Sequence, residues 1–338
     1  MGRMIFRVDD SGIPLMGCIA FGFIDRGTNV IQVRPTSLCP LSCIFCSTDA
    51  GPMSRTRITE YIVDLDYMIE WFREIVRLKG INDIEAHIDT VGDPFTYDRL
   101  PELVQELASF DEVKVVSIQT HGHLLNEWIL DELDEAGLSR INLSIDALDP
   151  ELARVMAGTP SYDVGKVMRM AEYIVENTSI DLLIAPLWLP GYNDHEIPRI
   201  IEYAIKIGAG KKWPPLGIQK YIPHKRGRKP KGVKPMTWQQ FHAKLAEWEK
   251  KYNVKLILSP EDFGTYKTGM IECPFKVGEA VTVKIVGPGW RKGEWLATAR
   301  NRSITVTGVP FPEPPIDSYV KVKIIGTKHN IVMAEFRP

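Results

Sequence analysis

The sequence predicts an α/β protein in two parts, a full or partial β/α barrel followed by a small all-β barrel. Between residues 29 and 260, short apolar segments alternate with amphipathic ones in about six units of roughly 35–40 residues, which is typical of a parallel sheet with helical crossovers. After about residue 260 the apolar residues recur at period two. They form five short stretches within about 60 residues, which predicts a small closed or nearly closed barrel.

Amphipathic spacing is clearest in residues 64–79, where one helical face collects Leu65, Met68, Ile69, Phe72, Ile75, Val76 and Leu78. The predicted helices of the first part are 64–79, 97–110, 126–136, 150–156, 164–177, 196–207 and 237–252. The predicted strands are 29–34, 83–89, 113–119, 140–145, 179–187 and 216–221, followed by a last extended piece at 254–258. In the second part, strands are expected at 280–286, 294–300, 303–307, 319–326 and 331–336. The expected organisation is an extended N-terminal lead-in (1–28), a β/α barrel (29–260), a linker (261–278) and a small barrel (279–338).

Composition places the chain among ordinary globular proteins. Of its 338 residues, 44% are hydrophobic and 25% are charged, so one large and one small domain can each bury a core. No apolar run approaches the roughly 20 residues that span a bilayer, and no signal peptide opens the sequence. Five cysteines in this setting fit a reduced, oxygen-sensitive, cytoplasmic protein with no membrane partner.

The net charge of −2 conceals opposite charges in the two parts of the chain. Residues 1–210 contain 17 Lys and Arg against 33 Asp and Glu, a balance of −16, whereas residues 211–338 contain 24 against 10, a balance of +14. This asymmetry suggests that the C-terminal part meets a polyanion. An ordinary solvated surface is the alternative, although it does not explain the change of sign.

Three of the five cysteines fall within eight residues, in the stretch Cys39-Pro40-Leu41-Ser42-Cys43-Ile44-Phe45-Cys46. The spacing C-x3-C-x2-C closes a small loop that can surround a metal centre, and three thiolates leave one corner of a four-iron cluster open for chemistry. A disulfide is disfavoured, because three is odd and the chain is not a short secreted scaffold. A structural zinc site that borrows a histidine or a distant cysteine is the alternative. The isolated Cys18 is expected to be a buried or half-buried thiol.

Polar and turn-forming residues cluster where the predicted strands end. Each stretch alone would be an ordinary turn. The C-terminal ends of parallel strands meet on one face, however, and β/α barrels carry their functional groups there. The stretches are Cys39–Cys46 after the first strand, Thr90–Pro94 after the second, Thr120–His123 after the third, Ser144 and Asp146 at the fourth, and Pro190–Asp194 after the fifth.

The cysteine stretch resembles the cluster loop of the radical S-adenosylmethionine (SAM) enzymes, with Phe45 as the aromatic residue before the last cysteine. The chain supports this resemblance over roughly residues 29–260. It implies that Cys39, Cys43 and Cys46 hold three irons of a [4Fe–4S] cluster whose fourth iron chelates SAM. An electron from a donor such as a ferredoxin or flavodoxin would then cleave SAM to methionine and a 5′-deoxyadenosyl radical, which takes hydrogen from a substrate.

Further segments resemble the SAM-contact segments of that family. Gly92-Asp93-Pro94 is similar to a Gly-Glu-Pro element, with Asp93 in place of Glu, and Ser117–Leu125 is similar to a segment that usually reads Thr-Asn-Gly, with His121 in place of Asn. The stretches around Ser144 and Leu189 resemble the segments beside the ribose and the adenine. The residues that the resemblance implies as SAM contacts are Phe45, Gly92, Asp93, Pro94, Thr120, His121, Ser144, Asp146, Arg154 and Leu189.

The last 60 residues resemble a TRAM domain, the small RNA-binding β-barrel that tRNA methylthiotransferases also carry. A second basic element lies after the sixth predicted strand, where six of the ten residues 225–234 are Lys or Arg in a Gly/Pro-rich loop. Cationic side chains would follow a phosphate backbone and aromatic rings would stack on bases, whereas a buried core position is the alternative for Trp295. The candidate RNA-binding residues are Lys225, Arg226, Arg228, Lys229, Lys231, Trp290, Arg291, Lys292, Arg300 and Arg302.

The resulting hypothesis is a radical SAM enzyme that modifies a nucleoside in structured RNA, tRNA before rRNA, by carbon methylation or a related radical insertion. Only Cys18 precedes Cys39, so methylthiotransferase chemistry with a second cluster before the barrel is disfavoured. Cys273 is a candidate catalytic residue that would carry a methyl group or quench a substrate radical, with simple burial as the alternative. Two other function classes remain open: a radical SAM enzyme acting on a small molecule or peptide, and a non-enzymatic RNA-binding protein with a structural metal centre.

Overall fold

The computed structural model describes residues 3–308 and 316–337. Its main body is a six-stranded sheet in the order β2-β3-β5-β6-β7-β8, with β2 antiparallel at one edge and all other neighbours parallel. The strands are β2 (Gly22–Asp25), β3 (Val30–Arg34), β5 (Ile84–Ile88), β6 (Val113–Thr120), β7 (Arg140–Leu143) and β8 (Asp181–Ile184). A bridge between Ile184 and Leu216 leads from β8 to the parallel pair β9 (Leu187–Trp188) and β10 (Gln219–Lys220). The prediction of a partial β/α barrel is confirmed.

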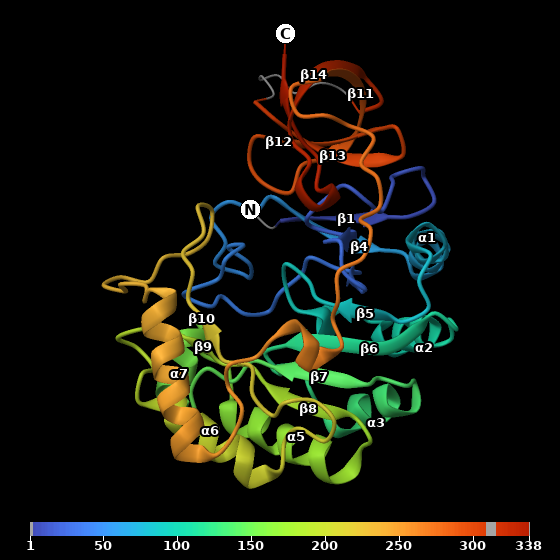
Figure 1. Cartoon of the computed structure of the whole chain (residues 1–338). Coiled ribbons are helices and arrows are strands. Elements are labelled where there is room, and N and C mark those ends of the chain that lie inside the picture. The colour runs from blue at the N-terminus through green and yellow to red at the C-terminus, as the bar shows by residue number, and fades with distance from the viewer. Residues whose placement is uncertain (1–2, 309–315, 338) are drawn as a thin grey trace.

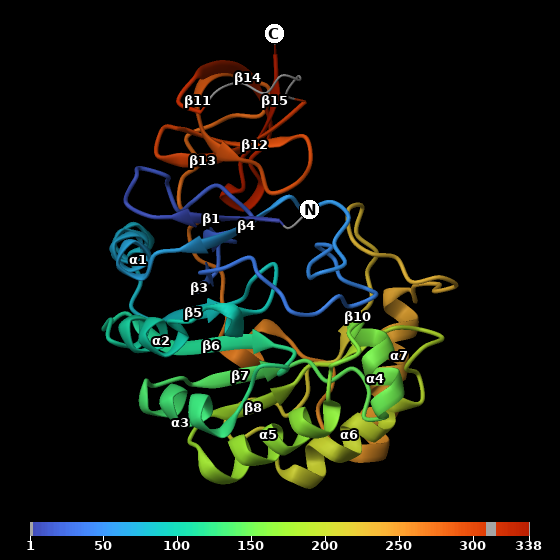
Figure 2. The same cartoon turned by 180° about the vertical axis from the view of Figure 1, so that it is seen from behind.

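Helices follow the strands and lie on the outer side of the curved sheet (Figure 1, Figure 2). They are α1 (Leu65–Lys79), α2 (Leu100–Ala108), α3 (Glu127–Glu135), α4 (Pro150–Ala157), α5 (Val164–Asn177) and α6 (Glu196–Ile207), with α7 (Trp238–Tyr252) packed against α6. The side chain of Asp64 caps α1 by accepting a hydrogen bond from the N–H of Tyr67, and Gly80 ends the helix at φ 61°. Within the described residues, none of the helices has the length and apolar character needed to cross a bilayer.

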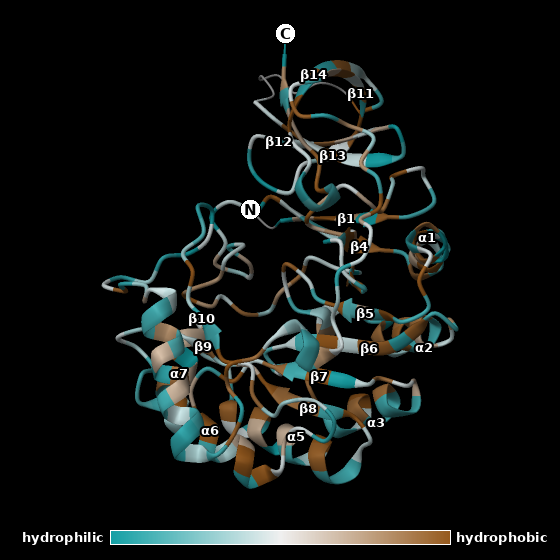
Figure 3. Ribbon diagram, viewed as in Figure 1, coloured by the Kyte–Doolittle hydropathy of each residue, from teal (hydrophilic) through white to brown (hydrophobic). Residues whose placement is uncertain are grey.

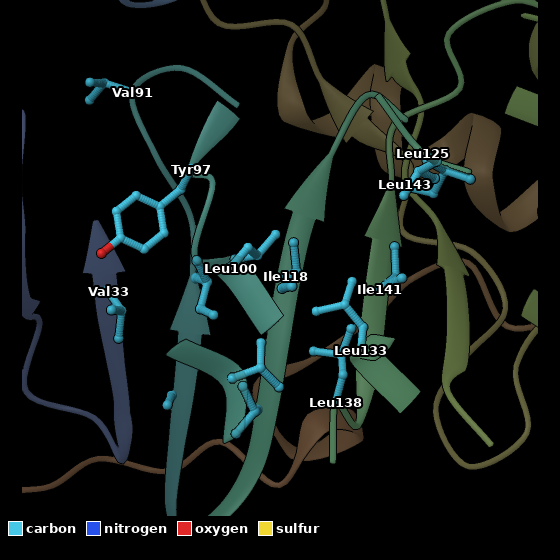
Figure 4. Packing of buried hydrophobic residues seen from close by; sticks show 14 of the residues in the cluster. Val33, Val91, Tyr97, Leu100, Ile118, Leu125, Leu133, Leu138, Ile141 and Leu143 are labelled. Carbon is cyan, nitrogen blue, oxygen red and sulfur yellow. The ribbon is translucent and has the colours of Figure 1, made fainter. Parts of the chain in front are cut away.

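The core lies between the sheet and the helices. The apolar side of each helix faces the sheet and its polar side faces outward (Figure 3). Ile118 and Ile141 of neighbouring strands are fully buried, as is Leu133 of α3 (Figure 4). Close packing of this kind holds the strand ends, and therefore the loops that follow them, in fixed positions.

The C-terminal part is a closed five-stranded barrel in the order β11-β12-β13-β15-β14. The strands are β11 (Ala280–Pro288), β12 (Glu294–Ala299), β13 (Arg302–Thr307), β14 (Tyr319–Gly326) and β15 (Met333–Phe336), which confirms the five predicted strands. Hydrogen bonds hold this barrel against the N-terminal segment and β4 (Thr59–Val63): the N–H of Ser303 donates to the carbonyl of Met16 at 2.8 Å, and the Tyr61 hydroxyl donates to the carbonyl of Pro288 at 2.8 Å.

Several elements differ from the expectation. β1 (Met4–Val8) and β4 (Thr59–Val63) form a separate parallel pair that the period-two pattern missed, because four of the five β4 residues are buried and no alternation remains. The expected lead-in 1–28 contributes β1 to this pair and β2 to the main sheet. Residues 254–258 form no strand: the N–H groups of Leu256 and Ile257 donate instead to the carboxylate of Glu249.

A buried ion pair joins the sheet edge to the linker that precedes the small barrel. The ammonium of Lys79, at the end of α1, lies 2.9 Å from the carboxylate of Asp25 in β2, and both side chains are fully buried. The Asp25 carboxylate also accepts hydrogen bonds from the N–H groups of Gly27 and Ile271, and Lys79 donates to the carbonyl of Gly269. Every polar atom of the pair therefore has a partner.

We expect Lys79→Ala to lower the free energy of unfolding by about 3–5 kcal/mol, because the Asp25 carboxylate would stay buried without its cation. Guanidinium unfolding of the metal-free protein measures the change. Arg77→Ala, two residues earlier in an exposed ion pair with Glu74, is the matched control and should leave the unfolding midpoint unchanged. Equal midpoints for the two variants would show that the buried pair contributes no more than a surface pair.

Candidate active site

The cysteine loop follows β3 and forms one wall of a cavity of about 410 Å³. Cys43 is buried, whereas Cys39 and Cys46 are half-buried, and all three line the cavity. The opposite walls come from the loops after β5, β6, β7 and β8 and from the segment after β10. The cavity therefore lies at the C-terminal ends of the parallel strands, where the strand order places the predicted polar stretches.

Two neighbouring segments fix the backbone of the cysteine loop. The N–H groups of Ser42 and Ile44 donate to the carbonyls of Ala157 and Met156 at the end of α4, both at 3.0 Å. On the other side, Gly92 is pressed against the carbonyl of Leu38 so closely that a Cβ atom there would overlap it. A side chain at position 92 would displace the start of the cysteine loop.

Two thiols of this loop, those of Cys39 and Cys43, resist ionisation because their pKa values are raised. Burial raises the pKa of Cys39 to about 12, and the negative charge of Asp93 adds to the effect. Burial also raises the pKa of Cys43 well above its usual range, and the neighbouring Cys39 and Cys46 raise it further. Because thiolates are the metal ligands, metal binding at this loop must release protons.

The donor set fits an iron–sulfur cluster. Within the described part of the chain, no three His, Cys, Asp or Glu side chains lie close enough together to hold one metal ion. A [4Fe–4S] cluster makes a different demand, since each cysteine binds its own iron. Three thiols on one cavity wall satisfy that demand.

Asp93 fastens two strand-end loops to each other. Its carboxylate accepts hydrogen bonds from the Thr120 hydroxyl at 2.9 and 3.0 Å and from the N–H of His121 at 3.2 Å. It also caps the short turn that begins at Pro94, by accepting from the N–H of Phe95. Asp93 and Thr120 thus line the cavity while they form hydrogen bonds with each other, and these bonds hold two loops of the cavity wall together.

His121 and Asp146 form a polar pair beside the cysteines. The Nε2 atom of His121 lies 3.9 Å from the Cys43 sulfur, and its Nδ1 atom lies 3.8 Å from the Asp146 carboxylate. Burial raises the pKa of the Asp146 carboxyl, while the nearby His121 opposes this shift. Asp146 also accepts a hydrogen bond from the N–H of Leu187 at 2.7 Å, and Ser144 lines the same wall.

The structure brings most, but not all, of the predicted SAM contacts to the cavity. The predicted residues that line it are Phe45, Gly92, Asp93, Thr120, His121, Ser144 and Asp146. The other three predicted contacts have different surroundings. Pro94 is buried at the start of its turn, Leu189 is fully buried with its N–H bound to the side-chain oxygen of Asn193, and Arg154 pairs with Glu151 on α4. None of the three is among the residues that line the cavity.

The basic loop, residues 224–231, packs directly on the cysteine loop. The N–H of Arg228 donates to the carbonyl of Cys46 at 2.8 Å, and its guanidinium donates to the carbonyls of Cys43, at 2.9 Å, and Ala50. The same guanidinium lies 3.0 Å from the Asp49 carboxylate. Arg228 is therefore turned inward as a brace for the cysteine loop, which corrects its assignment as an RNA contact.

The remaining cations of the basic loop face outward. Arg226 pairs with Glu294 of the small barrel, whereas Lys225, Lys229 and Lys231 are exposed and line a groove of about 870 Å³ on the outer side of the cysteine loop. Arg55 lies on the same groove. The loop thus has an inner face that holds the cysteines and an outer face that offers positive charge.

The small barrel offers fewer RNA contacts than its sequence predicts. Trp290 is buried, with the guanidinium groups of Arg57 and Arg291 at 4.5 and 4.1 Å from its ring centre, so its faces are not open to a base. Arg302 is buried and donates to the carbonyl of Glu272. These assignments are corrected, because both side chains serve the joint between the two parts.

The remaining candidate residues of the small barrel and the linker are either exposed or packed in a core. Lys292 and Arg300 are exposed, and Arg300 pairs with Glu279 at 2.7 Å. Trp295 lies in the barrel core, as its alternative reading expected. Cys273 packs against that core and is not among the residues that line the cavity, which favours the alternative of simple burial. Cys18 is buried, as expected, and burial raises its pKa to about 11.

Sequence reasoning missed two groups of residues at this site. Arg57 is buried and donates to the carbonyls of Ser37 and Val91 at 2.9 and 2.5 Å, tying the cysteine loop to the loop after β5. No local pattern marks such a residue. Lys220 and His224 also line the cavity. Lys220 lies near the end of the sixth predicted strand and His224 shortly after it, and this position is the signal that could have identified them.

Comparison with known proteins agrees with this geometry. The family model of the radical SAM superfamily matches residues 33–204. An uncharacterized protein of Methanocaldococcus jannaschii is 46% identical over 341 residues, which cover 96% of this chain and 78% of that protein. A probable GTP 3′,8-cyclase of Archaeoglobus fulgidus is 29% identical over 194 residues, covering 57% of this chain and 60% of the cyclase.

A solved structure shows the same fold. The crystal structure of Streptococcus suis SuiB bound to S-adenosylmethionine superposes with a TM-score of 0.50 at 15% identity, covering 72% of this chain and 50% of SuiB. The matched family model begins at the end of β3 and includes the cysteine loop and the strand-end loops up to α6. The chain belongs to the radical SAM superfamily, and its cofactors are a [4Fe–4S] cluster and S-adenosylmethionine.

Proposed function

We propose that this protein modifies a nucleoside in structured RNA, tRNA before rRNA, by carbon methylation or a related radical insertion. The observation that carries the proposal is the contact between the basic loop and the cysteine loop. Exposed Lys225, Lys229 and Lys231 line a groove whose other wall is the back of the cysteine loop. A polyanion bound in that groove would lie beside the radical site.

The residues of the cavity wall would have two roles, cluster binding and SAM binding. Cys39, Cys43 and Cys46 would hold the cluster, and Phe45, His121, Ser144 and Asp146 would surround SAM. When bound there, the cluster and SAM would supply a carbon radical for hydrogen abstraction from a substrate. The electron comes from a separate carrier such as a ferredoxin or flavodoxin.

Electrostatics favours a nucleic acid over an uncharged substrate. Lysines near a phosphate backbone release condensed counterions on binding, so affinity depends steeply on salt. Arg228 anchors the basic loop on Asp49 of the acidic N-terminal half, and Arg226 anchors it on Glu294 of the small barrel. The positive charge is thereby held at one place, on the outer side of the cysteine loop.

A small nucleotide is the second candidate substrate. The likeness to a probable GTP 3′,8-cyclase over 57% of this chain favours it, and the groove lysines would bind a triphosphate by the same chemistry. A peptide or uncharged small molecule has no comparable observation in its favour.

The RNA proposal predicts steeply salt-dependent binding of a tRNA pool. Replacing Lys225, Lys229 and Lys231 together by Ala should weaken binding at least tenfold and reduce the slope of log K against log salt by about 3, close to the 0.9 per contact expected for three lost phosphate contacts. Filter binding across salt concentrations measures both. Alanine substitutions at the exposed Lys114, Lys206 and Lys250 are the matched control. GTP binding without RNA binding would favour the second candidate.

The enzymatic proposal predicts that anaerobically reconstituted protein cleaves SAM reductively and that Cys43→Ala abolishes this cleavage, because one iron loses its thiolate. Liquid chromatography of 5′-deoxyadenosine measures it. Comparing nucleoside mass spectra of total RNA from cells with and without the gene identifies the product. Purified protein that contains zinc and no iron would contradict the proposal.

Arg228 is expected to position the cluster. Arg228→Gln removes the pairing with Asp49 and weakens the hydrogen bonds to the carbonyls of Cys43 and Ala50, so cluster affinity should fall about 10–100-fold. Iron and sulfide content and the visible absorbance during chelator challenge measure it. Arg226→Gln, in the same loop but paired with the small barrel, should retain the cluster like the unmodified protein. Equal cluster loss in both variants would assign the effect to the loop as a whole.

A further inference from the structure

A second cavity adjoins the first one inside the partial barrel. Its volume is about 340 Å³, and it shares Gln119, Ala185 and Gln219 with the cysteine-lined cavity. The main sheet forms one wall through β6, β7 and β8, and helix α7 with residues 256–263 forms the other. The two cavities are therefore neighbouring compartments of one space.

The chemistry of the second cavity differs from that of the first. Aspartates and a lysine line the first cavity, whereas no Lys, Arg, Asp or Glu is among the described residues that line the second. Histidines line both, with His242 in the second. Instead, the side-chain amides of Gln119, Asn142 and Gln219 meet apolar and aromatic residues of α7. Such a lining suits a group that is uncharged, planar and rich in hydrogen-bonding atoms.

The amides have hydrogen-bonding capacity to spare. The side chains of Gln119 and Gln219 form no hydrogen bond with any described residue, and both belong to both cavities. Asn142 accepts from Nε of Arg140 at 3.0 Å, which leaves its NH₂ group free to donate. Each amide can both donate and accept, as reading the edge of a nucleobase requires.

Trp238 stands at the rim of this cavity with 55% of its surface exposed. It is the first residue of α7, and a capping box between Thr237 and Gln240 fixes the start of that helix. The Lys220 ammonium lies 5.0 Å from its ring centre. An exposed ring beside a cation, four residues after the lysine-rich stretch 225–234, is a platform on which a base can stack.

The two adjoining cavities can be assigned to the two molecules that must meet in the reaction. SAM would occupy the cavity that the cysteines line, which leaves the adjoining space for the part of the substrate that reacts. We propose that the second cavity receives one nucleobase of the RNA, turned out of its stack, with Trp238 stacking at the rim and Gln119, Asn142 and Gln219 contacting its edge. This inference rests on the proposed RNA substrate and adds to it a specific base-binding site.

Stacking and charge can be tested separately. The probes are a 15-nucleotide oligouridine and an abasic ribose-phosphate oligomer of the same length, at one low salt concentration. The unmodified protein should bind oligouridine more tightly than the abasic oligomer. Trp238→Ala should weaken oligouridine binding about tenfold and leave abasic binding unchanged. Trp238→Phe, which keeps a ring, should restore most of the loss.

Trp128 provides the matched control, since it is a tryptophan with 66% of its surface exposed on α3 and lines neither cavity. Trp128→Ala should bind both probes like the unmodified protein. Equal affinities for Trp238→Ala and Trp128→Ala would overturn the base-binding site while the RNA proposal stands. Failure of both oligomers and of tRNA to bind the unmodified protein would overturn the RNA proposal itself.

The amides make a separate prediction about selectivity. Asn142→Leu removes a hydrogen-bonding group of similar size and should reduce the difference in affinity among 15-mers of A, C, G and U, with no effect on abasic binding. Fluorescence anisotropy of end-labelled oligomers measures this difference. An unchanged order and spread of the four affinities would exclude Asn142 from base reading.

Discussion

The position of the cysteine loop is the constraint on which the rest of the active site depends. Three cysteines must present their sulfurs to one cluster, yet a short loop after a strand has no regular hydrogen bonding of its own. Helix α4 supplies partners for two of its N–H groups, and Arg228 supplies donors for two of its carbonyls and for that of Ala50 just after it. Gly92 allows the next strand-end loop to approach without a side chain between them. The site is thus built by backbone contacts between segments that lie far apart in sequence.

The electrostatics of this loop follow from the same arrangement. Buried thiols close to one another and to Asp93 resist ionisation, as the raised pKa values of Cys39 and Cys43 show. Arg57 and Arg228 bring compensating positive charge to the same backbone. A cluster bound there would carry negative charge on its thiolates and sulfides, so the two guanidinium groups stabilise the loaded state more than the empty one.

The sequence predicts the features whose causes are local. Amphipathic spacing locates the helices, and the C-x3-C-x2-C spacing locates the cluster loop, because in both cases neighbouring residues act together. The pairing of β1 with β4 and the inward turn of Arg228 escape prediction, since each depends on a partner far along the chain. Trp290 looked like a surface ring because it stands beside Arg291, but the joint between the two parts buries it.

The number of cations in residues 225–234 indicates a binding site for a polyanion, but it does not show which cations are free to bind and which hold the loop in place. Six cations in ten residues predict a polyanion site, and the loop does lie on the active face. Two of the six cations, Arg228 and Arg226, form ion pairs with Asp49 and Glu294 and so hold the loop in place. This anchoring fixes the positions of the remaining lysines. An unanchored loop would lose more conformational entropy when it binds a partner, so anchoring favours binding. The roles within one loop are therefore complementary: Arg228 braces the cysteine loop, Arg226 ties the basic loop to the small barrel, and the exposed lysines remain available to a partner.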